Sequence, residues 1–192
     1  MKKYKIILSS NSPRRKELLA GLDVDFEVKV IPNINESYPD NLSAHEIPKY
    51  IAVEKAAAYN ISDSELVITA DTVVVLNNIV LGKPKDAQEA IEMLRMLSGN
   101  THEVITGVCL TTATKQNSFS VSTEVTFKKI SEDEINYYVS KYHPFDKAGA
   151  YGIQEWIGYI GVTSIKGSYF NVMGLPVQRI YDEIGKLIVE NQ

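Results

Sequence analysis

The sequence predicts an α/β fold in which a mixed, twisted sheet has flanking helices. Apolar, β-branched runs alternate along the chain with segments of helical periodicity, which is typical of an α/β domain. Asn77-Asn78 separates two apolar runs as a tight turn, and Lys115-Gln116-Asn117 separates two longer ones, so antiparallel hairpins are also expected. Hairpins beside helix–strand alternation indicate a mixed sheet rather than a purely parallel one.

Turn and capping residues mark the elements in the first third of the chain. Ser12 is a candidate N-cap, and Pro13 suits the first position of the helix that follows it. Ser43 and Glu46 form a capping-box pattern for the next helix, although Pro48 favours a later start. Strands are expected at 4–9 and 26–31, helices at 13–20 and 43–59, and a polar loop at 32–41.

The remaining elements are bounded in the same way. Asp86 with Glu89, and Ser131 with Glu134, form two more capping boxes. Pro176 suits the start of the last helix. Strands are expected at 66–76, 79–81, 103–112, 119–130 and 159–165, and helices at 86–97, from 131 to about 142, and from 176 onward.

Length and composition limit the classes of protein to consider. The 192 residues suffice for a single domain, 1–192, with a proper core, either undivided or as two lobes around a cleft. A net charge of −4 argues against general binding of nucleic acid or of an anionic membrane. With Cys109 as the only cysteine, the chain has no internal disulfide, which fits a reducing cytoplasm. The apolar run before Ser9 is too short for a signal peptide or a membrane span.

An anion site is expected where the first strand ends. The strand runs into a small polar turn at Ser9-Ser10-Asn11, and the next helix opens with Arg14 and Arg15 in its first turn. Cations at this position face the positive end of the helix dipole, which is unfavourable. An anionic ligand bound there would explain why two arginines are present. Hydroxyl, backbone N–H and guanidinium groups together suit a phosphate chain. The alternative is a surface helix start with solvated arginines.

Asp71 is the strongest candidate for chemistry. It interrupts the apolar run 66–76, where an unpaired buried carboxylate would be costly. It is therefore expected at a bulge or strand end with a functional role, or at a sheet edge with a structural one. The hairpin would bring Lys83 back near Asp71, although Lys83 alone resembles a solvated turn residue. Lys55 lies in a helix of small residues and, on the sequence alone, is expected to reach the surface.

Glu36, in the polar loop, joins Asp71 as a candidate metal ligand. Carboxylates are the hard oxygen ligands that Mg²⁺ or Mn²⁺ prefers, with nucleotide phosphates completing the shell. The alternative for Glu36 is a solvated loop acid. The three histidines lack the spacing of a zinc site. Cys109 lies in an apolar run and is expected in the core rather than as a nucleophile.

The segment 146–154 alternates small residues with one aromatic residue. Such a run lets the backbone approach a flat ligand closely. Tyr151 could pack against that ligand, and Gln154 could offer it both a donor and an acceptor. A packed loop is the alternative.

The motifs occur in the order and spacing of the Maf family, which the chain resembles over nearly its whole length. The resemblance implies a fold similar to the inosine triphosphatase group, an elongated mixed α/β structure with a central cleft, often homodimeric. It also implies a house-cleaning nucleoside triphosphate pyrophosphatase that cleaves between the α- and β-phosphates. The matching motifs are Ser12-Pro13-Arg14-Arg15-x-Glu17-Leu18-Leu19, Ala70-Asp71-Thr72, Gly82-Lys83-Pro84, Leu97-Ser98-Gly99, Asp146-Lys147-Ala148-Gly149-Ala150-Tyr151-Gly152-Ile153-Gln154 and Gly174-Leu175-Pro176.

The resemblance further implies roles for single residues. Asp71 matches the family's catalytic acid, the proton acceptor for the attacking water, which acts with a divalent metal ion. Thr72 and Gln154, with Arg14, match the subgroup acting on dTTP and UTP, whereas the subgroup that favours 7-methyl-GTP resembles Trp, Gln and Glu there. Asn35 departs from the family, which usually has two acidic residues where this chain retains only Glu36. The implied phosphate-binding residues are Ser10, Arg14, Arg15, Lys55 and Lys83.

Two other classes of function use the same phosphate cradle. One is a nucleotide-binding regulator without turnover, since the family has been linked to cell division and septum formation. The other is a phosphatase or a nucleotidyltransferase, which product identity would distinguish from a pyrophosphatase. The expected partners are a nucleoside triphosphate and a second copy of the chain, without nucleic acid or membrane, and the expected location is the cytoplasm.

Overall fold

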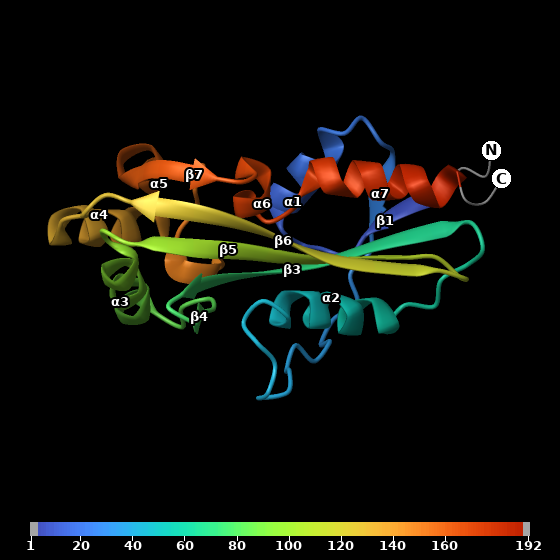
Figure 1. The fold of residues 1–192 in the computed structure, drawn as a ribbon, viewed down its shortest axis with the longest axis horizontal. Coiled ribbons are helices and arrows are strands. Elements are labelled where there is room, and N and C mark those ends of the chain that lie inside the picture. The colour runs from blue at the N-terminus through green and yellow to red at the C-terminus, as the bar shows by residue number, and fades with distance from the viewer. Residues whose placement is uncertain (1–3, 190–192) are drawn as a thin grey trace. The chain divides into compact units, whose positions relative to one another are not determined.

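The computed structural model describes residues 4–189, and the side chains of residues 4–187. The strands follow the order β2-β1-β3-β5-β6-β7, with β4 paired to β3 (Figure 1). β1 pairs in parallel with β2 and β3, whereas the β3–β4 and β6–β7 pairs are antiparallel, which confirms the predicted mixed α/β class. The strands are β1 (Lys5–Leu8), β2 (Phe26–Val28), β3 (Glu65–Leu76), β4 (Ile79–Leu81), β5 (Thr101–Thr111), β6 (Gln116–Phe127) and β7 (Val162–Lys166).

Seven α-helices and one short 3₁₀ helix are assigned within the described residues. They are α1 (Pro13–Ala20), α2 (Ile47–Ala57), α3 (Ala87–Leu97), α4 (Glu132–Tyr142), η1 (Ala148–Ala150), α5 (Trp156–Gly161), α6 (Tyr169–Met173) and α7 (Val177–Val189). None of the helices between residues 4 and 189 combines the length and apolar character that crossing a bilayer requires.

The chain divides into two compact units, each of which is described by itself. Unit 1 comprises Met1–Asp71, Thr106–Val121 and Gly174–Gln192. Unit 2 comprises Thr72–Ile105 and Ser122–Met173. The strands β3, β5 and β6 contribute residues to both units.

Unit 1 begins with a β1–α1–β2 crossover, and β3 pairs with the other side of β1. The Ser12 side chain accepts a hydrogen bond from the Arg15 N–H, and Pro13 occupies the first turn of α1, as predicted. The last β1–β3 partners are Leu8 and Ile68, after which the Ser9 N–H donates to the Ile68 carbonyl. The carboxyl end of β1, where the strand order reverses, therefore lies beside the middle of β3. In α/β sheets this is the usual position for a ligand.

Helix α2 packs closely on the sheet of unit 1, on the opposite face from α1 and α7 (Figure 1). A Cβ atom on Gly107 of β5 would lie 2.2 Å from the Lys49 nitrogen, so only glycine permits this approach. Ala52, Ala56 and Cys109 form one buried cluster, as expected for Cys109. Burial also raises the pKa of the Cys109 thiol.

The predicted start of α2 at Ser43 is wrong. The helix begins at Ile47, and Pro48 lies in its first turn. Ser43 still donates through its N–H and Oγ to Glu46 Oε2, but these bonds close a turn that precedes the helix. A proline is tolerated in the first turn of a helix and not in the interior, so Pro48 sets the boundary.

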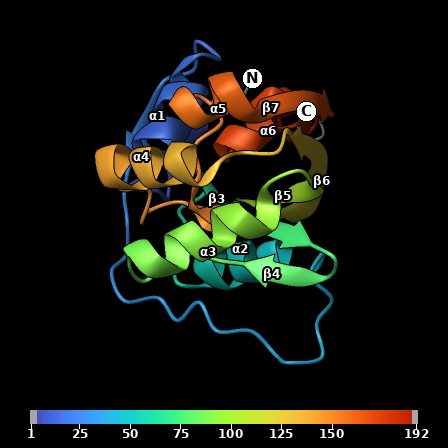
Figure 2. The same ribbon diagram turned by 90° about the vertical axis from the view of Figure 1, so that its left-hand side faces the viewer.

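Unit 2 encloses a hydrophobic core of its own. Its helices α3 and α4 pack side by side (Figure 2). The predicted capping box of Ser131 with Glu134 is confirmed. Asp86 is the predicted N-cap and accepts from the Glu89 N–H, but the box is incomplete because Glu89 Oε2 accepts from the Lys85 N–H instead. The β3–β4 turn has positive φ at both Asn77 and Asn78, as a tight hairpin requires.

The strand predicted at 159–165 is half wrong. α5 occupies Trp156–Gly161, and only Val162–Lys166 form a strand, β7. Ile157 and Gly161 are four residues apart and both buried, which is helical periodicity. A short apolar run does not by itself distinguish the two structures.

The core of unit 2 contains a histidine that should make folding sensitive to acid. His102 is buried against Phe127 and Tyr151, and its Nε2 lies 2.8 Å from the Tyr151 hydroxyl oxygen. Its Nδ1 is buried and has no hydrogen-bond partner among the described residues. Burial lowers the pKa of His102 from 6.5 to about 4, because a charged imidazole is costly in this core.

We expect His102 to lower the free energy of unfolding as the pH falls. The stability associated with burying the neutral imidazole of His102 is fully present above pH 6.5. It is lost as the pH falls from 6.5 to 4, because in this range His102 is protonated in the unfolded chain and still neutral in the folded one. The shift corresponds to about 3 kcal/mol. Urea unfolding across this range should show a shallower pH dependence for His102→Gln, whereas His45→Gln, at an exposed position, should retain the original slope. Equal slopes for all three proteins would contradict the prediction.

Candidate active site

Asp71 lies in the middle of β3 rather than at its end. The strand runs without interruption from Glu65 to Leu76 and lies inside the strand order of the sheet, so the predicted strand end and edge strand are not found. Pairing with β1 ends at Ile68 and pairing with β4 begins at Val74, so Asp71 lies in the stretch of β3 between these two partners. Side chains alternate along a strand, so Thr69 and Asp71 point to the same face. Buried Thr69 donates to the Ala52 carbonyl at 2.6 Å, which joins β3 to α2 directly beside Asp71.

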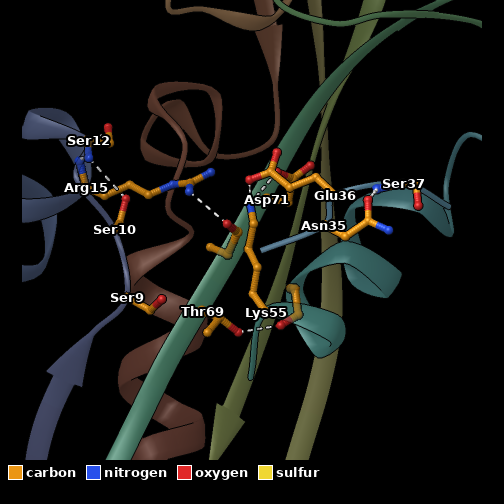
Figure 3. A network of polar contacts seen from close by, with 12 residues as sticks. Ser9, Ser10, Ser12, Arg15, Asn35, Glu36, Ser37, Lys55, Thr69 and Asp71 are labelled. Atoms are coloured by element: carbon orange, nitrogen blue, oxygen red, sulfur yellow. Dashed lines mark hydrogen bonds and ion pairs between the residues drawn. The ribbon is translucent and has the colours of Figure 1, made fainter. Parts of the chain in front are cut away.

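Lys55, in the last turn of α2, forms an ion pair with Asp71. Its Nζ lies 3.0 Å from Asp71 Oδ1, and the two side chains are only 13% and 17% exposed (Figure 3). The expectation that Lys55 reaches the surface is therefore wrong, because a partner on another element draws it inward. Opposite charges this close, and shielded from most of the solvent, attract each other more strongly than a pair on the open surface does.

Glu36 approaches the same lysine from the loop that follows β2. Its Oε1 lies 3.0 Å from Lys55 Nζ, with the Glu36 side chain 54% exposed. Asn35, where the family usually has an acid, instead accepts a hydrogen bond from the Ser37 N–H through its own Oδ1. In Figure 3, Glu36 and Asp71 converge on Lys55, while Asn35 turns toward Ser37. The structure thus brings together the two predicted metal ligands and leaves Asn35 to shape the loop.

Arg15 extends from the first turn of α1 toward the backbone next to Asp71. Its Nε donates to the Gly174 carbonyl and its Nη1 to the Ala70 carbonyl, both at 2.8 Å. Burial lowers the pKa of Arg15, and the nearby Asp71 charge acts in the opposite direction. The ordinary pKa of arginine is high enough for the charge to persist. Arg15 therefore holds the residue preceding Asp71 in place and adds a positive charge that is largely shielded from solvent. The positive charge of Arg14 is close enough to lower the pKa of Arg15 further.

The turn between β1 and α1 is held by its own hydroxyl groups. Buried Ser10 accepts the Ser12 N–H through its Oγ at 3.2 Å, and Ser12 caps the helix. The Tyr59 hydroxyl lies 2.6 Å from Ser9 Oγ. The predicted phosphate loop is thus fixed in position beside Arg15 (Figure 3).

Two carboxylates on unit 1, Glu36 and Asp71, are the candidate ligands for a divalent cation. Glu36 and Asp71 already share one cationic group, Lys55 Nζ, so their oxygens converge on positive charge. Mg²⁺ typically takes one or two carboxylates and completes its shell with water and substrate phosphates. Within the described residues, no cluster of three or more His, Cys, Asp or Glu side chains suits a metal. The two carboxylates therefore fit a metal ion that binds together with a triphosphate and do not form a closed protein cage.

The other predicted residues, Thr72, Lys83 and Gln154, lie in unit 2. The register of β3 and β4 pairs Val74 with Leu81, so the chain that follows β4 runs back along β3 toward Thr72. The Gly149 N–H donates to the Gly82 carbonyl, which places the loop of exposed Lys83 against the segment 146–154. The predicted proximity of Lys83 to Asp71 stays a prediction.

Gln154 has a buried amide oxygen without a partner among the described residues. Buried polar atoms are nearly always satisfied, so an orphan acceptor indicates a place for a ligand donor. The next residue, Glu155, contacts both Tyr138 and Lys147, and sequence reasoning assigned none of these three to the site. Tyr138 lies on α4 and Glu155 precedes α5, 17 residues further along the chain, and no local pattern in the sequence links them.

Comparison with known proteins shows which family the chain belongs to. A sequence profile described as Maf-like protein matches residues 5–187. The chain belongs to the Maf family. A Maf protein of Phocaeicola vulgatus is 64% identical over 189 residues, covering 97% of this chain and 98% of the relative.

Two further Maf relatives cover the chain to a similar extent. The protein of Bacteroides thetaiotaomicron is 59% identical over 187 residues, covering 96% of this chain and 97% of its own. That of Flavobacterium johnsoniae is 47% identical over 190 residues, covering 98% and 97%. All three are named dTTP/UTP pyrophosphatase.

Proposed function

We propose that this Maf protein is a nucleoside triphosphate pyrophosphatase that hydrolyses dTTP and UTP to the nucleoside monophosphate and pyrophosphate. The observation that carries the proposal is the convergence of Lys55, Asp71 and Glu36 next to the buried Arg15 guanidinium. The site lies where the β1–α1 turn presents an ordered helix N-terminus, the position at which α/β proteins bind phosphate. The names of the relatives support this activity and these substrates.

The proposed roles follow from charge and position. Asp71 accepts a proton from the water that attacks the α-phosphorus, while the P–O bond to the β-phosphate breaks and pyrophosphate leaves. Lys55 holds Asp71 in position by its ion pair and adds positive charge for the phosphates. Ser10, Arg14, Arg15 and Lys83 complete the proposed phosphate-binding set. When bound by Asp71 and Glu36, Mg²⁺ or Mn²⁺ supplies Lewis-acid stabilisation of negative charge on the phosphates.

Three residues are assigned to base recognition, two of them in unit 2. Gln154 offers an amide donor and an acceptor, and its buried oxygen lacks a protein partner. Thr72, directly after Asp71, is the second proposed specificity residue, and Arg14 the third. Use of modified pyrimidine nucleotides, a cytoplasmic location and pairing of two copies stay predictions from the family resemblance.

Product analysis tests the proposed function. Purified protein is incubated with dTTP, UTP, CTP, GTP and 7-methyl-GTP, with and without Mg²⁺ or Mn²⁺, and the products are separated by anion-exchange chromatography. Monophosphate and pyrophosphate from dTTP and UTP are expected, and chelation should abolish them. Phosphate with a diphosphate would indicate a phosphatase instead. Turnover of 7-methyl-GTP alone would contradict the assigned substrates, and binding without any product would favour the regulator.

A further inference from the structure

Unit 2 contains a buried ionic network to which none of the roles above assigns a function. Glu155 accepts a hydrogen bond from the Tyr138 hydroxyl on Oε2, and its Oε1 lies 3.1 Å from Lys147 Nζ. The Lys147 side chain is only 9% exposed and also lies 2.7 Å from Asp146 Oδ1. Tyr138 is fully buried. The Glu155 side chain is 20% exposed, and each of its two carboxylate oxygens has its own partner, as a partly buried charge requires.

The network encloses the backbone that precedes Gln154. The Tyr138 oxygen accepts the Gly152 N–H at 3.0 Å, and the Glu155 N–H donates to the Gly152 carbonyl at 3.0 Å. A Cβ atom on Gly152 would lie 3.0 Å from Glu155 Oε2 and 3.1 Å from Gln154 Nε2. The Glu155 carboxylate and the amino end of the Gln154 amide therefore lie on the same side of Gly152.

The negative charge of Glu155 favours one of the two orientations of the nearby Gln154 amide. A carboxylate only accepts hydrogen bonds, so it favours the Gln154 NH₂ end nearby and disfavours the carbonyl end. Gln154 Oε1 is accordingly buried without a protein partner. Uracil and thymine carry a hydrogen-bond donor at N3, whereas cytosine carries an acceptor there. An amide fixed in this orientation accepts from the first two bases and leaves cytosine N3 unpaired.

We infer that Glu155 is a positioning residue for base discrimination. Held by Tyr138 and Lys147, it keeps the Gln154 amide turned so that Oε1 accepts the N3–H of uracil or thymine. The inference rests on the proposed function, because it requires Gln154 to contact the base. It adds three residues, Glu155, Tyr138 and Lys147, to the proposed specificity machinery.

The test compares kcat and KM for UTP and CTP in the whole protein and in Glu155→Gln. This substitution keeps the shape of the side chain and removes its charge, so the Gln154 amide becomes free to turn. We expect the UTP-to-CTP ratio of kcat/KM to fall by about tenfold, mainly through KM, with kcat for UTP retained. Tyr138→Phe, which releases Glu155 Oε2 and the Gly152 N–H but leaves Lys147 on Oε1, should lower the ratio by a smaller factor. Glu132→Gln, at an exposed position on α4 in the same unit, should leave it unchanged.

Gln154→Ala distinguishes the role of Glu155 from the role of Gln154 itself. An unchanged ratio in both Glu155→Gln and Tyr138→Phe, together with a lowered ratio in Gln154→Ala, would overturn the inference and leave the proposed function intact. Equal loss of activity toward both nucleotides at an unchanged ratio would indicate a merely structural network. If the unaltered protein does not hydrolyse UTP, the proposed function itself fails. Thermal unfolding of each variant is measured first, and Tyr138→Phe decides the matter if Glu155→Gln does not fold.

Discussion

Asp71→Asn is expected to lower kcat for UTP by about 10³-fold, with KM changed only a few-fold. Asparagine has nearly the same shape but cannot accept a proton from the attacking water near neutral pH. The variant should fold, because Lys55 retains Glu36 as a partner when Asp71 loses its charge. Steady-state release of pyrophosphate measures kcat, and thermal unfolding checks the fold.

Two control variants show whether the loss of kcat in Asp71→Asn is specific to this carboxylate. Asp182→Asn removes an exposed carboxylate from α7 in the same unit and should leave kcat unchanged. Glu36→Gln removes the half-exposed partner of Lys55 and should reduce activity less than Asp71→Asn does. Turnover of Asp71→Asn within tenfold of the unaltered protein would exclude Asp71 as the base.

Gly107→Ala is expected to have the largest effect on stability, about 3 kcal/mol in the free energy of unfolding. The added Cβ would lie 2.2 Å from both the Lys49 nitrogen and the Pro48 carbonyl carbon, which are backbone atoms of the first turn of α2. The helix must therefore move, and Lys55 moves with it. Because displacement of a positioned group by about 1 Å can cost 10²-fold in rate, kcat should fall on the order of 10²-fold.

Gly185→Ala in α7 is the matched control. Nothing lies within 4 Å of a Cβ atom at this position, and alanine is favoured over glycine inside a helix. This substitution should raise the free energy of unfolding by about 0.5–1 kcal/mol. Urea unfolding of both variants makes the comparison. Equal stability of the Gly107→Ala and unaltered proteins would show that α2 does not depend on the bare backbone of β5.

Local features of the fold could be predicted from the sequence. The N-caps at Ser12, Asp86 and Ser131 are confirmed, because capping depends on residues three positions apart. The Ser43 pattern failed although its hydrogen bonds form, since Pro48 nearby determines where a helix can begin. Segment 159–165 failed because a six-residue helix and a strand place similar apolar residues in so short a run.

The sequence predicted which residues belong to the candidate site, but it did not predict which of them contact one another. Asp71 was expected at a bulge, a strand end or a sheet edge, yet it lies within β3, an interior strand of the sheet, where Lys55 pairs with it. Lys55 was expected at the surface because its own helix shows no partner, and its partner lies 16 residues further along the chain. The Arg15 contacts with Ala70 and Gly174 join residues 55 and 159 positions apart, distances over which no pattern in a single sequence extends.

The Thr69–Ala52 hydrogen bond has a consequence for which changes in length the site tolerates. Asp71 lies two residues beyond Thr69 on β3, and Lys55 lies three residues beyond Ala52 on α2. The ion pair therefore joins the same two elements as the hydrogen bond, one strand repeat and about one helical turn further along. The spacing of the reactive pair is thus set by the repeat of a strand and the repeat of a helix. A single residue inserted between Thr69 and Asp71 would turn the carboxylate to the other face of the sheet. Insertions should therefore accumulate in the loop over 32–41 and be excluded from these two short intervals.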